Sequence, residues 1–149
     1  MYTEYQPSHL LVPYIDSYWE FKGNPDYGMR IHILPDGCTD FIFTLGEVAD
    51  TVEEESLIMQ PYRSYFVGPM TKYSELVTYT ESIHMFGVRF LPCGLSCFTN
   101  LPLHEFVNSR VSTNEMKAVF DDTFIEKLGE QKHVTDRIRV VEEYLLAYL

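Results

Sequence analysis

The chain has 149 residues, of which 46% are hydrophobic and 15% aromatic, so it can form the core of one domain and is not expected to be disordered. Its 22 acidic and 11 basic residues give a net charge of −11. Surfaces that bind nucleic acids neutralise phosphates with lysine and arginine, so this chain is not expected to bind DNA by itself. Three cysteines, no signal-peptide pattern and no membrane-length apolar run predict free thiols in a cytoplasmic protein.

Short strands separated by turns are predicted for the first two-thirds of the chain. After a helical turn or two over residues 8–14, strands are expected at 18–21, 29–34, 39–45, 56–59, 65–67, 75–80 and 83–90, with an acidic loop at 46–55. In the third of these, Phe41, Phe43 and Leu45 alternate with Asp40, Ile42 and Thr44, which is typical of a strand with two different faces. Short strands at regular intervals indicate a sandwich or a barrel.

Beyond Pro92 the pattern becomes helical. Ser112 and Glu115 fit a capping box, and apolar residues spaced three and four apart follow as far as a stop at Gly129. A last helix is capped by Thr135. Its apolar stripe consists of Ile138, Val141, Leu145 and Tyr148. The long connection between these two helices and their excess of acids argue against a helix-turn-helix unit.

Three stretches of the chain are strands interrupted at fixed points by proline or glycine. They are Ile33–Phe43 (ILPDGCTDFIF), Val67-Gly68-Pro69 and Phe86–Gly94 (FGVRFLPCG). In this order, after the segment Pro13–Trp19, they resemble the N-terminal sensor domain of AraC-type bacterial transcriptional regulators, from about Pro7 to the C-terminus. The motif positions are Pro35, Asp36, Gly37, Asp40, Gly68, Pro69, Gly87 and Arg89.

The resemblance implies one domain of the mainly β class with C-terminal helices. A cupin-like double-stranded β-helix barrel with a short N-terminal helix would occupy residues 1–92, and helices would occupy residues 93–149. It also implies that the barrel binds a small effector and that the helices form a homodimer, through the stripe Ile138, Val141, Leu145 and Tyr148. The two helix-turn-helix units that bind DNA in such regulators have no counterpart in this sequence, so DNA contact would need another domain.

Several strand residues are candidates for contact with an effector. They are Trp19, Phe21, His32, Phe43, Tyr65 and Arg89. Aromatic walls with a few polar groups are typical of small-molecule sites, although ordinary core packing is the favoured interpretation of each aromatic residue. Arg89 shares a face with Ile83, Met85 and Gly87, and two interpretations stay open for it. It forms an ion pair with an aspartate that ties two strands, or it receives an anionic group of the ligand.

No catalytic pattern is found in the chain. The five histidines stand singly, without the His-x-His pair of cupin metal sites, and Cys93, Cys97 and His104 are too loosely spaced for a metal cluster, so buried structural thiols are expected there. No catalytic residue, metal or cofactor is therefore predicted. Two alternatives stay open: a small cupin-like metal-dependent isomerase or oxygenase, and an interaction module whose filled barrel binds no ligand.

Overall fold

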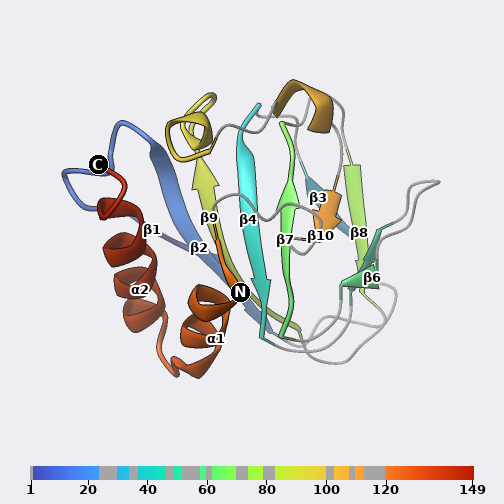
Figure 1. Ribbon diagram of the computed structural model, residues 1–149. Coiled ribbons are helices and arrows are strands. Elements are labelled where there is room, and N and C mark those ends of the chain that lie inside the picture. Colours follow the sequence, from blue (N-terminus) through green and yellow to red (C-terminus); the bar gives the residue numbers. More distant parts are fainter. Residues whose placement is uncertain are drawn as a thin grey trace.

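The computed structural model describes residues 2–23, 30–33, 37–45, 49–51, 58–59, 62–69, 74–78, 83–99, 103–107, 110–112 and 120–149. Within them, the strands form two antiparallel sheets (Figure 1). The six-stranded sheet has the order β1 (Tyr2–Tyr5), β2 (Ile15–Gly23), β9 (Ile83–Phe90), β4 (Thr39–Thr44), β7 (Ser64–Val67) and β10 (Arg110–Ser112). The four-stranded sheet has the order β3 (Arg30–Ile33), β8 (Ser74–Thr78), β5 (Ala49–Thr51) and β6 (Ile58–Met59).

The helices lie on one side of the six-stranded sheet, and the four-stranded sheet lies on the other side (Figure 1). The six-stranded sheet therefore has an outer face toward the helices and an inner face toward the second sheet. Its strands carry apolar side chains on both faces, because successive residues of a strand point to opposite sides. In β4, Phe41 and Phe43 belong to the outer cluster and Ile42 to the inner one, as the predicted alternation requires.

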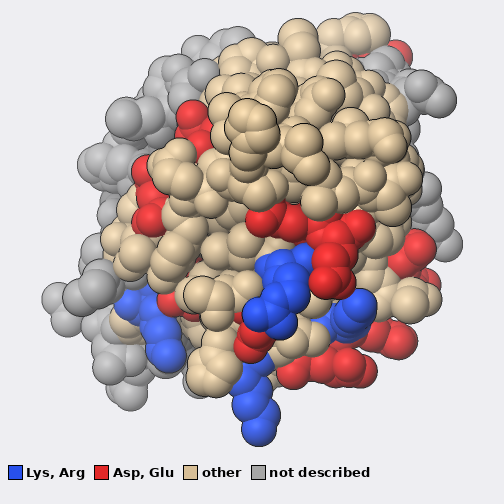
Figure 2. Space-filling view, turned by 90° about the vertical axis from the view of Figure 1, so that its left-hand side faces the viewer, with Lys and Arg blue, Asp and Glu red and all other residues tan. Residues whose placement is uncertain are grey.

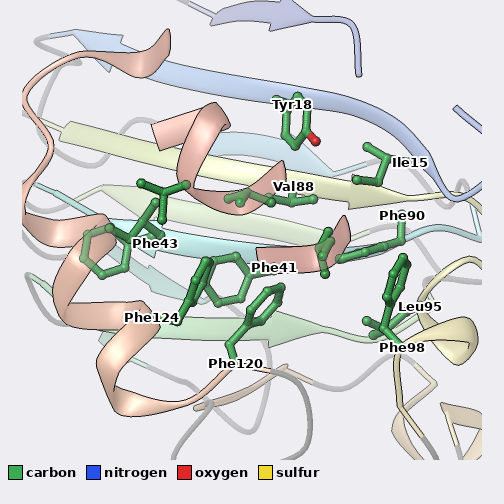
Figure 3. Close-up of a cluster of buried hydrophobic side chains, with 14 of the residues drawn as sticks. Ile15, Tyr18, Phe41, Phe43, Val88, Phe90, Leu95, Phe98, Phe120 and Phe124 are labelled. Atoms are coloured by element: carbon green, nitrogen blue, oxygen red, sulfur yellow. The ribbon is translucent and has the colours of Figure 1, made fainter. Parts of the chain in front are cut away.

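The outer face and the helices share an aromatic core (Figure 3). Phe41 pairs in register with Phe66 and Val88, and its ring lies 4.4 Å from that of Phe120, measured between centroids. Phe120 in turn lies 4.6 Å from Phe124 of α1 (Asp122–Glu130). Ring pairs at these separations add about 1 kcal/mol each to the burial of their area. The helices are therefore an integral part of the core on the outer face of the six-stranded sheet.

Helix α1 begins later than predicted. Asp121 is its N-cap, and the Asp121 side chain accepts a hydrogen bond of 2.8 Å from the backbone nitrogen of Phe124. Ser112, expected in a capping box, ends strand β10, and residues 113–119 lie outside the described residues. Gly129 does not stop α1, which continues through Glu130. The Asp121 side chain satisfies a backbone donor, and its negative charge interacts favourably with the positive end of the helix dipole.

Helix α2 (Val134–Leu146) begins one residue before the predicted cap at Thr135, and its N-cap is His133 without a side-chain hydrogen bond. The helical turns predicted over residues 8–14 are confirmed, and two short 3₁₀-helices lie beyond Pro92. Residues 8–14 form hydrogen-bonded turns that bury Leu11, while a 3₁₀-helix, η1, spans Leu95–Cys97. A second 3₁₀-helix, η2, spans Leu103–Phe106.

Candidate ligand site

The inner face of the six-stranded sheet carries an apolar cluster that is separate from the helix-side core. Its buried members are Trp19, Ile42, Tyr65, Val67, Ile83 and Met85, with Phe21 packed against them. They come from β2, β4, β7 and β9, and members on the same strand are two positions apart. We call this set the inner cluster. An apolar wall of this kind is the common lining of a small-molecule site.

Trp19 lies flat over the neighbouring strand because the residue opposite it is a glycine. Trp19 and Gly87 are partners in the β2–β9 register. A Cβ atom added to Gly87 would lie 2.0 Å from Cε2 of the indole, so any larger residue would displace the ring. The indole is 6% exposed, and its Nε1 is buried without a hydrogen-bond acceptor among the described residues.

Arg89 ties the central strands at one end of the inner face. Its Nε donates to Oδ1 of Asp40 at 3.2 Å, and the two residues are partners in the β4–β9 register. Its Nη1 lies 3.3 Å from the hydroxyl of Tyr2 and 3.4 Å from Oε1 of Glu4, both in β1. The structure thus contains the ion pair between two strands that is one of the two interpretations of Arg89.

The pKa values in this cluster follow from burial and from the neighbouring charges. Burial acts most strongly, to lower the pKa of Arg89, but the interactions with Asp40 and Tyr2 together outweigh it, so the pKa is raised and the guanidinium stays charged. Burial, together with the hydrogen bond that Tyr2 donates to Glu4 at 2.8 Å, raises the pKa of Tyr2 to about 12. At neutral pH Arg89 is therefore charged and the Tyr2 hydroxyl keeps its proton.

The structure brings four of the six candidate ligand residues to the inner face: Trp19, Phe21, Tyr65 and Arg89. Phe43 is not one of them. It is 1% exposed in the helix-side core, and its Cζ would lie 3.4 Å from a Cβ on Gly129 of α1. The reason is the strand alternation, which points Ile42 inward and Phe43 outward. The backbone of His32 lies in β3, and its side chain is outside the described residues.

The motif glycines and prolines have separate structural roles where they are described. Gly37 has φ of 73°, the left-handed conformation that a tight turn requires and that glycine adopts without strain. Gly68 is buried directly after β7, and Pro69 is half-buried beside it. Pro35 and Asp36 lie outside the described residues.

The stripe predicted to form a dimer packs mainly inside this chain. Val141 and Leu145 are 0% exposed in the helix-side core, and Ile138 is half-buried against it, whereas Tyr148 is 49% exposed. The three-and-four spacing correctly indicates an apolar helix face, but that face covers the sheet. Val141 and Leu145 are therefore inaccessible to a second subunit in this structure.

A buried arginine that the sequence pattern did not indicate fastens α2 to the sheet. Arg137 is 4% exposed, its Nη2 donates to the carbonyl oxygen of Gln131 at 2.8 Å, and its Nη1 lies 3.6 Å from Oε2 of Glu20 in β2. The same Glu20 oxygen lies 2.9 Å from Nε2 of His84 in β9. Burial lowers the pKa of Arg137, with the Glu20 carboxylate opposing that shift. This arrangement links the barrel wall to the start of α2.

A groove of about 380 Å³ lies between α1 and α2, with Phe124, Tyr144 and Tyr148 among its lining residues. On the side of the molecule shown in Figure 2, basic side chains lie among acidic ones and form no separate patch. Cys93 and Cys97 are exposed, so they are not the buried thiols that were predicted.

No group of three histidine, cysteine or acidic side chains is placed to hold a metal ion in the described part of the chain. No helix within that part is long and apolar enough to span a membrane.

The fold is mainly β, with helices at the C-terminus, which confirms the predicted class. The chain belongs to the family described as "Domain of unknown function (DUF6597)", whose model matches residues 3–112. No curated protein matches its sequence.

Solved structures resemble the chain in fold at very low sequence identity. ToxT from Vibrio cholerae matches with a TM-score of 0.50 and 6% identity, over 89% of this chain and 55% of ToxT. The Cupin_2 domain of an XRE family transcriptional regulator from Enterobacter cloacae matches with a TM-score of 0.49 and 10% identity, over 62% of this chain and 96% of that domain. A cupin domain of Cnp3 from Schizosaccharomyces pombe has a TM-score of 0.47 and 8% identity, over 60% of this chain and 59% of the matched one.

Proposed function

We propose that this chain is the effector-sensing domain of an AraC-type transcriptional regulator and that it acts without catalysing a reaction. In this proposal a small molecule binds at the inner cluster, and the C-terminal helices carry the response to the DNA-binding part of the regulator. The observation that carries the proposal is the pair of separate apolar clusters on the two faces of one sheet. The spacing of the three sequence motifs and the likeness of the fold to ToxT support it.

The strand β2 offers a short route between the two faces. Trp19 belongs to the inner cluster, while its neighbour Glu20 points outward and lies 3.6 Å from Arg137 of α2. β2 and α2 would move together between two placements. A ligand that binds more tightly to one placement of β2 shifts the equilibrium toward the matching placement of α2. The response then needs only a small displacement of one strand.

Homodimerisation through the C-terminal helices is also part of the proposal. Because Val141 and Leu145 are used inside the chain, the contact between subunits would come from the outer surfaces of α1 and α2. The net charge of −11 supports a separate DNA-binding domain, since acidic surfaces repel phosphates.

Native mass spectrometry of the purified chain, after incubation with a small-molecule extract of bacterial cells, tests the proposal. We expect one retained small molecule per subunit and a dimer peak. Val67→Trp, which fills the inner face, should lose the retained molecule, whereas Leu10→Trp at an exposed position should keep it. Circular dichroism would verify that both variants fold. The absence of any retained molecule from the unmodified chain, or equal retention by the two variants, would contradict ligand sensing.

A further inference from the structure

The buried indole N–H of Trp19 is a hydrogen-bond donor without an acceptor. Trp19 is 6% exposed, and its Nε1 has no partner among the described residues. A buried donor that stays unpaired destabilises a fold, so native proteins rarely keep one without a reason. Most side chains clustered with it, such as Ile42 and Met85, offer no oxygen or nitrogen, and the hydroxyl of Tyr65 does not accept from Nε1. An acceptor brought by a ligand would satisfy this donor.

The indole ring itself is already packed, so its N–H is the group that a ligand can still contact. The Gly87 backbone lies under the ring, since a Cβ there would be 2.3 Å from Nε1. The ring of Tyr2 lies beside it, with 5.9 Å between centroids and 31° between planes. A ligand that stacks on Trp19 would have to displace Tyr2 from this position. A ligand that accepts from the N–H does not.

The charges near Trp19 oppose an anionic ligand. Arg89 is the one described cation of the inner face, and it is engaged by Asp40, Glu4 and the Tyr2 hydroxyl. An incoming carboxylate would have to replace one of these two carboxylates. Both belong to the chain, so their contact with Arg89 does not carry the entropy cost of binding a separate molecule. This local balance also removes the reason to assign Arg89 as the receiver of an anionic group.

We infer that the ligand of the inner cluster is an uncharged, largely apolar molecule with a carbonyl oxygen, such as a ketone, ester or lactone, and that this oxygen accepts a hydrogen bond from Nε1 of Trp19. The inference rests on the proposed function, because it assumes that a small molecule enters the barrel. It goes further by assigning the polar contact to one atom and by excluding a carboxylate head group.

Trp19 is the only tryptophan of the chain, so the donor can be observed directly. In a chain labelled with ¹⁵N-tryptophan, one indole resonance is expected in an NMR correlation spectrum. A panel of uncharged ketones, esters and lactones of six to twelve carbons should move the indole proton downfield, as a new hydrogen bond requires. Carboxylates of matched length should bind more weakly and leave it nearly unmoved.

Two variants separate the hydrogen bond from packing. Trp19→Phe removes the donor and keeps an aromatic ring, and replacing Trp19 by benzothienylalanine substitutes sulfur for the N–H in a ring of the same shape. In each, affinity for the carbonyl panel should fall roughly 3- to 10-fold, the usual effect of one neutral hydrogen bond. Phe21→Leu is the matched control, since it trims the same cluster without touching the donor.

The outcomes distinguish this inference from the proposed function. Tighter binding of carboxylates, unchanged affinity in the benzothienylalanine variant, or a panel in which no member binds would each overturn the inference. If an extract molecule is nevertheless retained in native mass spectra, the sensing proposal stands while the ligand class assigned here is wrong. If nothing is retained there either, both fail.

Discussion

Substitution of Gly87 by alanine is predicted to destabilise the barrel, although it adds a single methyl group. The new Cβ would lie 2.0 Å from Cε2 of Trp19, 1.4 Å closer than the 3.4 Å at which ordinary contact begins. The Trp19 ring cannot absorb this by a small adjustment, because Cζ2 and Nε1 would also lie within 2.3 Å of the new atom. Overpacking of this kind costs about 1–3 kcal/mol of the free energy of unfolding.

Gly129→Ala is the matched control, because it makes the same chemical change in α1. A Cβ on Gly129 would lie 3.4 Å from Cζ of Phe43, which is an ordinary contact, and alanine favours a helix over glycine. This variant should therefore gain up to about 1 kcal/mol. The two alanine substitutions are thus expected to change stability in opposite directions.

Urea unfolding followed by tryptophan fluorescence measures both variants. Since Trp19 is the sole tryptophan, its emission reports the same site that Gly87→Ala disturbs, and a red shift is expected in the folded variant. In a Trp19→Leu background, followed by circular dichroism, the cost of Gly87→Ala should largely disappear, because the clash has been removed. A Gly87→Ala variant with wild-type stability and emission would refute the packing described for this pair.

Two further predictions concern charged and titratable groups. Arg137→Met should lower the free energy of unfolding by about 3 kcal/mol, because it leaves Glu20 half-buried without its guanidinium partner, and urea unfolding should show most of this loss recovered when Glu20→Gln is added. The folded pKa of Tyr2, raised to about 12 from 10, predicts a contribution to stability that is complete below pH 10 and is lost as the pH rises toward 12. The free energy of unfolding, measured between pH 9 and 12, should therefore fall less steeply with pH in Tyr2→Phe than in the unmodified chain. Parallel pH curves for the two proteins would contradict this assignment.

The strand alternation made most of the barrel predictable. It did not show which face of β4 is the inner one, because both faces carry large apolar residues. Phe43 was assigned to the ligand site for this reason, and the helices decide the matter by covering its side of the sheet. The three-and-four spacing of α2 likewise indicated an apolar face, but spacing alone cannot identify what that face packs against.

Contacts between residues far apart in sequence were the least predictable. Strand β1 has no apolar run, and its residues Tyr2 and Glu4 are positioned by Arg89, 85 residues or more away. The sequence alone indicates that Arg137 is a solvated charge on a helix. The structure shows that Glu20, from the opposite end of the chain, lies beside it. The Arg89–Asp40 pair could be anticipated because both residues belong to the sequence motifs.

The strand order has a consequence for how the chain acquires its structure. β9 lies between β2 and β4 at the centre of the six-stranded sheet, yet it follows both in sequence by dozens of residues. During synthesis, β9 is made after β2 and β4, so neither of these strands can pair with it until then. Because loops must close before such distant pairs form, folding on the millisecond-to-second scale is expected, and a nascent chain ending before Phe90 would expose unpaired strand edges that chaperones recognise.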